Sequence, residues 1–149
     1  MIIVSACLMG WNCKYSGGSN KNEAVREIAE KGYYASVCPE VAGGLPVPRD
    51  PSELQPDGRV LSNRGADVTE AFRKGAEQEW LRVQELAEEF EEPIECAILK
   101  AKSPSCGCGR IYDGTFTGTL IDGDGIFAAL LKEKGIPVYT EKDLENKEK

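Results

Sequence analysis

The side chains best suited to chemistry in this sequence are six cysteines, and histidine is absent altogether. Without histidine there can be no Ser-His-Asp triad, no Cys-His nucleophile pair and no catalytic zinc held by imidazoles. Acid–base chemistry near neutral pH must therefore come from a carboxylate, a lysine, a thiol, a hydroxyl or a bound metal. The six thiols are Cys7, Cys13, Cys38, Cys96, Cys106 and Cys108.

Three of these thiols lie shortly after the ends of predicted strands, whose bounds are given below. Cys7 follows the first strand by two residues, Cys38 directly follows the second, and Cys106 lies seven residues past the third. In an open parallel sheet the carboxyl ends of the strands share one edge, and ligands bind there. The sequence therefore predicts that these three thiols meet in one site.

Soft thiolate ligands favour zinc, copper(I) or an iron–sulfur cluster. A structural zinc site normally uses paired C-x₂₋₄-C spacings, and neither Cys7 to Cys13 nor Cys106 to Cys108 has that spacing. A 4Fe–4S cluster usually takes four cysteines, so a set of three would leave one iron open to a substrate atom. An open metal position is typical of a catalytic site rather than a structural one.

The remaining cysteines have less definite interpretations. Cys96 lies inside the third predicted strand among apolar residues, which is typical of a buried structural thiol. Cys13 and Cys108 could each be a fourth ligand, a redox partner or an ordinary loop thiol. The sequence leaves these three roles open for both residues.

Polar residues near the trio are candidates for catalysis. Glu40 follows Cys38 by two residues and could act as a general acid or base, or be a solvated loop carboxylate. Ser103 and Ser105 flank Pro104 just before Cys106 and could orient a substrate, or only bond their own turn.

Three further positions are candidates for substrate binding. Gly43 and Gly44 would let the backbone approach a ligand closely. Arg49 could contact an anion, and it could equally form a salt bridge within its loop.

Strands alternate with helices along the chain, which predicts βαβ units and a mostly parallel sheet with flanking helices. The predicted strands are residues 2–5, 33–37, 94–99, 115–120 and 137–139. Three helices are predicted. The first is capped by Asn20 and ended by Gly32, the second runs over 68–90 with a capping signature of Asp67 and Glu70, and the third is capped by Asp124 and runs to Leu131.

The segment 41–66 is a long loop rich in proline, with a short hairpin expected around Asp57-Gly58. Loops of this length inside compact domains are usually functional lids or disordered. The charged tail from Glu141 is expected to fray.

A chain of 149 residues is predicted to form a single domain spanning residues 1–149. Its longest apolar run is far too short to cross a membrane, and its start lacks the basic and apolar regions of a signal peptide. A cytoplasmic protein with no membrane partner is therefore expected, and its cysteines should be reduced ligands or reactive thiols.

Acidic residues are concentrated in one segment of the chain. Residues 75–95 hold eight acidic side chains and one basic one, a balance equal to the whole net charge of −7. This pattern predicts one solvated helix face. It argues against a DNA partner, because duplex binding needs many basic contacts to phosphates, yet it allows a small anionic ligand elsewhere.

Three motifs, taken together and in this order, resemble the TudS-like thiouracil desulfurase family. They are Ser5-Ala6-Cys7-Leu8-Met9-Gly10, Cys38-Pro39-Glu40 followed by Gly43-Gly44-Leu45-Pro46-Val47-Pro48-Arg49, and Lys102-Ser103-Pro104-Ser105-Cys106-Gly107. The resemblance runs from Met1 to about Tyr139.

The resemblance implies a Rossmann-like domain with a 4Fe–4S cluster held by Cys7, Cys38 and Cys106. In the family the open iron binds the substrate's sulfur, and a thiolated pyrimidine base, nucleoside or nucleotide exchanges sulfur for oxygen. Glu40 and Ser103 match positions tied to catalysis, Glu40 for proton transfer. The expected reaction is hydrolytic and needs no external electron donor.

Other functions remain compatible with the same residues. The chain could be a non-catalytic metal or cluster carrier, or a redox switch in which Cys13 or Cys108 pairs with a neighbouring thiol. Desulfuration could also act on thiolated tRNA, although an acidic single-domain chain favours a small molecule.

Overall fold

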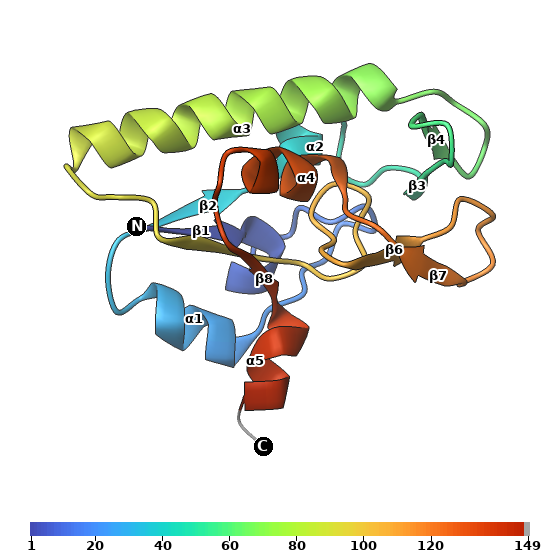
Figure 1. The fold of residues 1–149 in the computed structure, drawn as a ribbon. Coiled ribbons are helices and arrows are strands. Elements are labelled where there is room, and N and C mark those ends of the chain that lie inside the picture. The colour runs from blue at the N-terminus through green and yellow to red at the C-terminus, as the bar shows by residue number, and fades with distance from the viewer. Residues whose placement is uncertain (148–149) are drawn as a thin grey trace.

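The computed structural model describes residues 1–147, with residues 145–147 described by their backbone alone. At its centre lies a four-stranded, wholly parallel sheet in the order β2-β1-β5-β8 (Figure 1). Its strands are β1 Ile2–Ser5, β2 Tyr34–Val37, β5 Cys96–Leu99 and β8 Val138–Thr140. In β1, Ile2 is in register with Tyr34 on one side and Cys96 on the other. The predicted parallel α/β sheet is confirmed.

Helices cover both faces of this sheet, as a parallel sheet requires (Figure 1). One face carries α2 Pro39–Ala42, α3 Thr69–Glu89 and α4 Ile126–Glu133, and the other carries α1 Glu23–Ala29 and α5 Glu141–Lys147. A short 3₁₀ helix, η1 Ala6–Met9, follows β1. Across the described residues, no helix combines the length and apolar character needed to cross a membrane.

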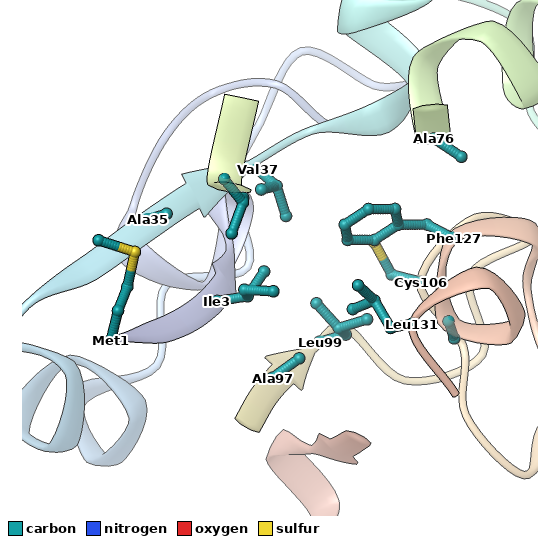
Figure 2. Close-up of a cluster of buried hydrophobic side chains, with 12 residues drawn as sticks. Met1, Ile3, Ala35, Val37, Ala76, Ala97, Leu99, Cys106, Phe127 and Leu131 are labelled. Carbon is teal, nitrogen blue, oxygen red and sulfur yellow. The ribbon is translucent and has the colours of Figure 1, made fainter. Parts of the chain in front are cut away.

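Two apolar clusters hold these layers together. On the α3 and α4 face, Ile3 and Leu99 of the sheet pack in one cluster with Phe127 of α4 (Figure 2). On the opposite face, Val4 of the sheet packs with Val25 of α1. Ile3 and Val4, two successive residues of β1, thus point into different clusters, and both are fully buried. This explains why the central strands read as continuous apolar runs.

Two antiparallel hairpins lie beyond the sheet at the ends of its strands (Figure 1). The first pairs β3 Ser52–Leu54 with β4 Val60–Ser62, and the second pairs β6 Arg110–Tyr112 with β7 Leu120–Asp122. The hairpin expected at Asp57-Gly58 is confirmed, and Gly58 takes the left-handed conformation (φ 90°) that such a turn favours.

One predicted strand is wrong and one predicted helix cap is displaced. Apart from Leu120, which begins β7, the expected strand over 115–120 is instead the loop between β6 and β7, where Thr115 donates its backbone N–H to the Asp113 carboxylate and Phe116 is left-handed (φ 57°). The first helix is capped by Asn22 rather than Asn20, since the Asn22 side chain accepts the Val25 N–H at 3.1 Å.

The ends of the last two helices also differ from the prediction. The N-cap of α4 is Gly125 instead of Asp124, whose carboxylate accepts the Gly109 N–H at 2.8 Å. The chain from Glu141 forms α5 rather than fraying, because Glu141 is buried and accepts the backbone N–H of Ala101. The last two residues of the expected tail, 148–149, lie outside the described residues.

Helices α2 and α3 touch backbone to backbone. A Cβ on Gly43 would lie 1.9 Å from the carbonyl oxygen of Ala71, and one on Gly75 would lie 1.7 Å from that of Pro39. Only glycine allows this approach. Because α2 begins just after Cys38, the contact also fixes the segment that follows the second strand.

Gly75→Ala tests this contact. Alanine is favoured over glycine inside a helix by about 1 kcal/mol. The added Cβ nevertheless forces α2 and α3 apart, so the free energy of unfolding should fall by about 1–3 kcal/mol in urea denaturation. Gly32→Ala is the control, because a Cβ there meets nothing within 4 Å. Equal stability of the two variants would contradict the packing argument.

Candidate active site

A cavity of about 600 Å³ lies at the carboxyl edge of the sheet. Cys7, Cys38 and Cys106 all line it, although they are far apart in sequence. The structure therefore brings the predicted trio together. Cys13 lines the same cavity, whereas Cys108 does not.

Cys7 lies in η1, the 3₁₀ helix that begins directly after β1. Its carbonyl accepts the backbone N–H of Asn20 at 3.0 Å and that of Gly10 at 3.2 Å. Burial raises the pKa of the Cys7 thiol, and a hydrogen bond from the Asn20 side chain opposes that rise. The position of this residue is thus set by main-chain bonds from the segment that follows η1.

Cys38 is the residue at which α2 begins. Its backbone N–H donates to the Glu79 carboxylate of α3 at 3.0 Å. Interaction with the Cys13 side chain lowers the pKa of Cys38, and the N–H of Val41 in α2 acts in the same direction. Cys38 Sγ also lies 3.8 Å from the Cys13 carbonyl oxygen.

Cys106 lies in a tight turn after β5 that is held by Ser103. The Ser103 hydroxyl oxygen accepts the backbone N–H of Ser105 at 3.1 Å and of Cys106 at 3.0 Å. Cys106 is 5% exposed and lies against the buried cluster near Phe127 (Figure 2). This burial raises the pKa of its thiol well above the usual range.

Glu40 lies in α2 rather than in a loop, and two side chains hold its carboxylate. Arg49 donates to Oε1 at 3.2 Å, and the Ser105 hydroxyl donates to Oε2 at 3.0 Å. Only 17% of the Glu40 side chain and 6% of the Arg49 side chain are exposed. The carboxylate is therefore fixed at the wall of the cavity.

The two serines form a directed chain of hydroxyls toward this carboxylate. An ionised carboxylate only accepts hydrogen bonds, so Ser105 must donate its proton to Glu40. The Ser105 oxygen, 3.0 Å from that of Ser103, is then free to accept from it. Both serines line the cavity, and Ser105 is 2% exposed.

The candidates for substrate binding separate in the structure. Arg49 lines the cavity, but it also donates to the carbonyls of Cys13 at 3.0 Å and Pro46 at 3.2 Å, in addition to its ion pair with Glu40. Gly43 packs on α3, and neither Gly43 nor Gly44 lines the cavity. The structure thus brings Arg49 to the site and leaves the glycine pair outside it.

Glu79 is a site residue that sequence reasoning missed. The acidic helix was expected to be solvated, yet Glu79 is 7% exposed and holds the Cys38 N–H. Arg82, the single basic residue of that acidic segment, forms an ion pair with Glu79 at 3.0 Å and also donates to the Ser36 carbonyl. The signal in the sequence was Arg82, the one basic residue of the segment, which lies three residues after Glu79 and could pair with it.

The cysteines outside the trio occupy distinct surroundings. Cys96 begins β5 and is partly exposed, so the expected full burial is wrong. Cys108 is also partly exposed and its thiol donates to the Val138 carbonyl at 3.6 Å, outside the cavity. Cys13 alone of these three joins the trio.

The chemistry of the donor set fits an iron–sulfur cluster. Thiolates are the usual ligands of such clusters. Three soft sulfurs, those of Cys7, Cys38 and Cys106, belong to residues that line the one cavity.

Comparison with known proteins identifies the family. The family model described as 2-thiouracil desulfurase matches residues 2–143. The chain belongs to this family. The desulfurase is 39% identical over 153 residues to the protein YbbK of Bacillus subtilis (strain 168), with 97% of each chain covered. It is also similar to the solved structure of the [4Fe-4S]-dependent thiouracil desulfidase TudS, with 42% identity and a TM-score of 0.82 over 97% of this chain and 93% of that one.

These findings confirm three predictions for the desulfurase: its family, its α/β fold and its character as an enzyme. The cofactor implied by the resemblance is the one on which TudS depends. The roles of individual residues in this chain stay predictions.

Glu79→Ala tests how the desulfurase fixes Cys38. The change leaves the buried N–H of Cys38 without its acceptor, so the free energy of unfolding should fall by about 2–3 kcal/mol in denaturant titrations. Glu85→Ala, on the exposed part of the same helix, should shift it by less than about 0.5 kcal/mol. An equally small effect at both positions would contradict the role given to Glu79.

Proposed function

We propose that this desulfurase removes sulfur from a thiolated pyrimidine with the help of a [4Fe–4S] cluster held by Cys7, Cys38 and Cys106. The observation that carries the proposal is the meeting of these thiols, from three separate segments, beside the buried carboxylate of Glu40. The similarity to TudS, a [4Fe-4S]-dependent thiouracil desulfidase, supports the same cofactor and substrate class.

When bound, the cluster would be held by Cys7, Cys38 and Cys106 and would supply a soft Lewis acid that suits a thiocarbonyl sulfur and polarises the ring carbon. Glu40 accepts a proton from water, whose oxygen adds to that carbon. Sulfur leaves as sulfide and the carbon keeps the oxygen, so the exchange is hydrolytic and consumes no electrons. Arg49 and Ser105 hold the carboxylate in one orientation for this transfer.

Ser103 has two tasks in this proposal. Its oxygen holds the turn of Cys106, and its proton is directed through Ser105 to Glu40. A proton accepted by Glu40 can be shared with the Ser105 hydroxyl, which lines the same cavity as the leaving sulfur would. Ser105 is the buried hydroxyl between Ser103 and Glu40, and it also lines the cavity.

The cavity walls favour an anionic substrate. Among the described residues, five basic and two acidic side chains line the cavity, in a protein whose net charge is −7. The two acidic residues are Glu40, which pairs with Arg49, and Glu53. Lys100 pairs with Glu141, which is not among the lining residues, and Lys14 has the Asn20 amide oxygen 3.5 Å away. A thiolated nucleotide, whose phosphate Lys14 and Lys102 would meet, therefore suits the cavity as well as the free base.

Single replacement of Cys7, Cys38 or Cys106 by alanine should abolish the brown colour of anaerobically purified protein and its desulfuration of thiouracil. The wild type should carry about four irons per chain and matching sulfide. Cys108→Ala, outside the cavity, is the matched control and should keep both iron and activity. Retention of a full cluster by any variant of the trio would remove that cysteine from the ligand set. A wild type that holds a cluster without turnover would support the carrier function instead.

Glu40→Gln separates proton transfer from cluster binding. Glutamine keeps the size of the side chain and an acceptor oxygen for Arg49, so iron content and the visible spectrum should not change. The rate constant kcat for thiouracil should fall by about 10²–10⁴-fold because the amide cannot accept a proton. Glu85→Gln serves as a surface control. Activity of Glu40→Gln near the wild-type level would exclude Glu40 as the base.

A further inference from the structure

The loop between β6 and β7 places an aromatic ring on the cavity wall. Phe116 lines the cavity, is 38% exposed, and has a left-handed backbone (φ 57°). A left-handed conformation is unfavourable for a bulky residue, and an exposed apolar ring gains little from folding. Two unfavourable features at one position, beside the site already described, indicate a role other than packing.

A buried carboxylate holds Phe116 in this conformation. Oε1 of Glu53, in β3, accepts the backbone N–H of Gly114 at 2.9 Å and that of Phe116 at 3.2 Å. Gln55 adds a bond from its side-chain amide to the Gly114 carbonyl at 3.1 Å. Within the part of the chain that the structure describes, Glu53 makes no salt bridge, and only 9% of it is exposed. Its charge is therefore satisfied by the loop backbone.

The proline-rich segment and the β6–β7 loop are thus joined, although they are about 60 residues apart. Their junction adds aromatic surface to the cavity, because Tyr15 and Tyr112 line it together with Phe116. Phe116 belongs to neither apolar core cluster of the described residues. Its exposed ring is therefore available to a ligand.

We infer that Phe116 is a stacking platform for the pyrimidine ring of the substrate, and that Glu53 is the positioning residue that holds it. The inference rests on the proposed function, since it presumes a planar thiolated base in this cavity. A stacked aromatic ring binds every pyrimidine through its π face, with or without sulfur. Phe116 should therefore contribute to the binding of substrate and of product alike.

The test is binding of uracil to the cluster-loaded enzyme by anaerobic calorimetry, together with kcat and KM for thiouracil. Phe116→Ala should weaken uracil binding and raise KM by at least about 5-fold, with kcat and the visible spectrum within about 2-fold of wild type. Phe116→Trp should bind at least as well as wild type. Phe90→Ala removes a similarly exposed ring far from the cavity and should change neither constant.

Variants of Glu53 test separately whether this residue positions Phe116. Glu53→Ala releases the N–H groups of Gly114 and Phe116 and should raise KM in the same direction, whereas Glu53→Gln keeps an acceptor oxygen and should restore it. Phe116→Leu, which keeps apolar bulk without the π face, takes the place of Phe116→Ala if the latter does not fold.

The outcomes distinguish the inference from the proposed function. A wild type that converts thiouracil, with uracil affinity and KM unchanged in Phe116→Ala or Phe116→Leu, would overturn the platform alone. A fully loaded wild type that neither binds uracil nor converts thiouracil would overturn both. Loss of the cluster spectrum in Phe116→Ala, with both the spectrum and the wild-type KM restored in Phe116→Leu, would also overturn it, because the residue would then act on the fold and not on the base.

Discussion

The site depends on one constraint: four parallel strands end at the same edge, and three of them pass directly into short, stiff segments. These segments are η1, α2 and the turn before Cys106. In each, the cysteine is fixed through its own main chain: the Cys7 carbonyl accepts from the backbone of Asn20 and Gly10, the Cys38 N–H donates to the Glu79 carboxylate, and the Cys106 N–H donates to the Ser103 hydroxyl. The backbone bonds that set the thiols in place do not involve the sulfurs themselves. The cavity is therefore shaped for a ligand by the fold alone.

Charge is divided between the acidic helix and the cavity. Most acidic residues of the segment 75–95, which covers the later part of α3 and the turn after it, are exposed, and their balance equals the net charge of the protein. The exception, Glu79, is neutralised by Arg82 and a backbone N–H. The basic residues that line the cavity can therefore attract an anionic ligand despite the net charge of −7. Net charge says little about such a site, because exposed charges more than about 10 Å apart are largely screened at moderate salt.

The features that could be predicted from the sequence are those determined by residues close together along the chain. Continuous apolar runs gave the central strands, their alternation with helices gave the parallel order, and the parallel order brought Cys7, Cys38 and Cys106 to one edge. What could not be predicted rests on tertiary partners. The helix α5 forms because Glu141 reaches the N–H of Ala101, and Glu79 is buried because Cys38 lies beneath it.

The pair Gly43 and Gly44 also shows that tertiary partners cannot be predicted from the sequence. Gly43 and Gly44 were interpreted as a place where backbone approaches a ligand, and Gly43 does allow a close approach. The partner is the carbonyl of Ala71 in α3, not a substrate. A glycine indicates that another group approaches the backbone closely, but the identity of that group depends on which element the fold places opposite the glycine. For the same reason Phe116 could not be recognised, since its conformation is imposed by Glu53, distant in sequence.

Ser103 shows why structure and chemistry cannot be separated at this edge. Its oxygen accepts two backbone N–H groups that shape the turn of Cys106, which leaves its proton as the only part available for chemistry. That proton faces Ser105, whose own proton faces Glu40. The direction of the chain follows from the carboxylate, which can only accept while it is ionised. Once Glu40 takes up a proton it can donate back to the Ser105 oxygen, whose own proton is then free to turn toward the cavity. The turn that holds one thiol thus also orients the carboxylate that we propose as the base.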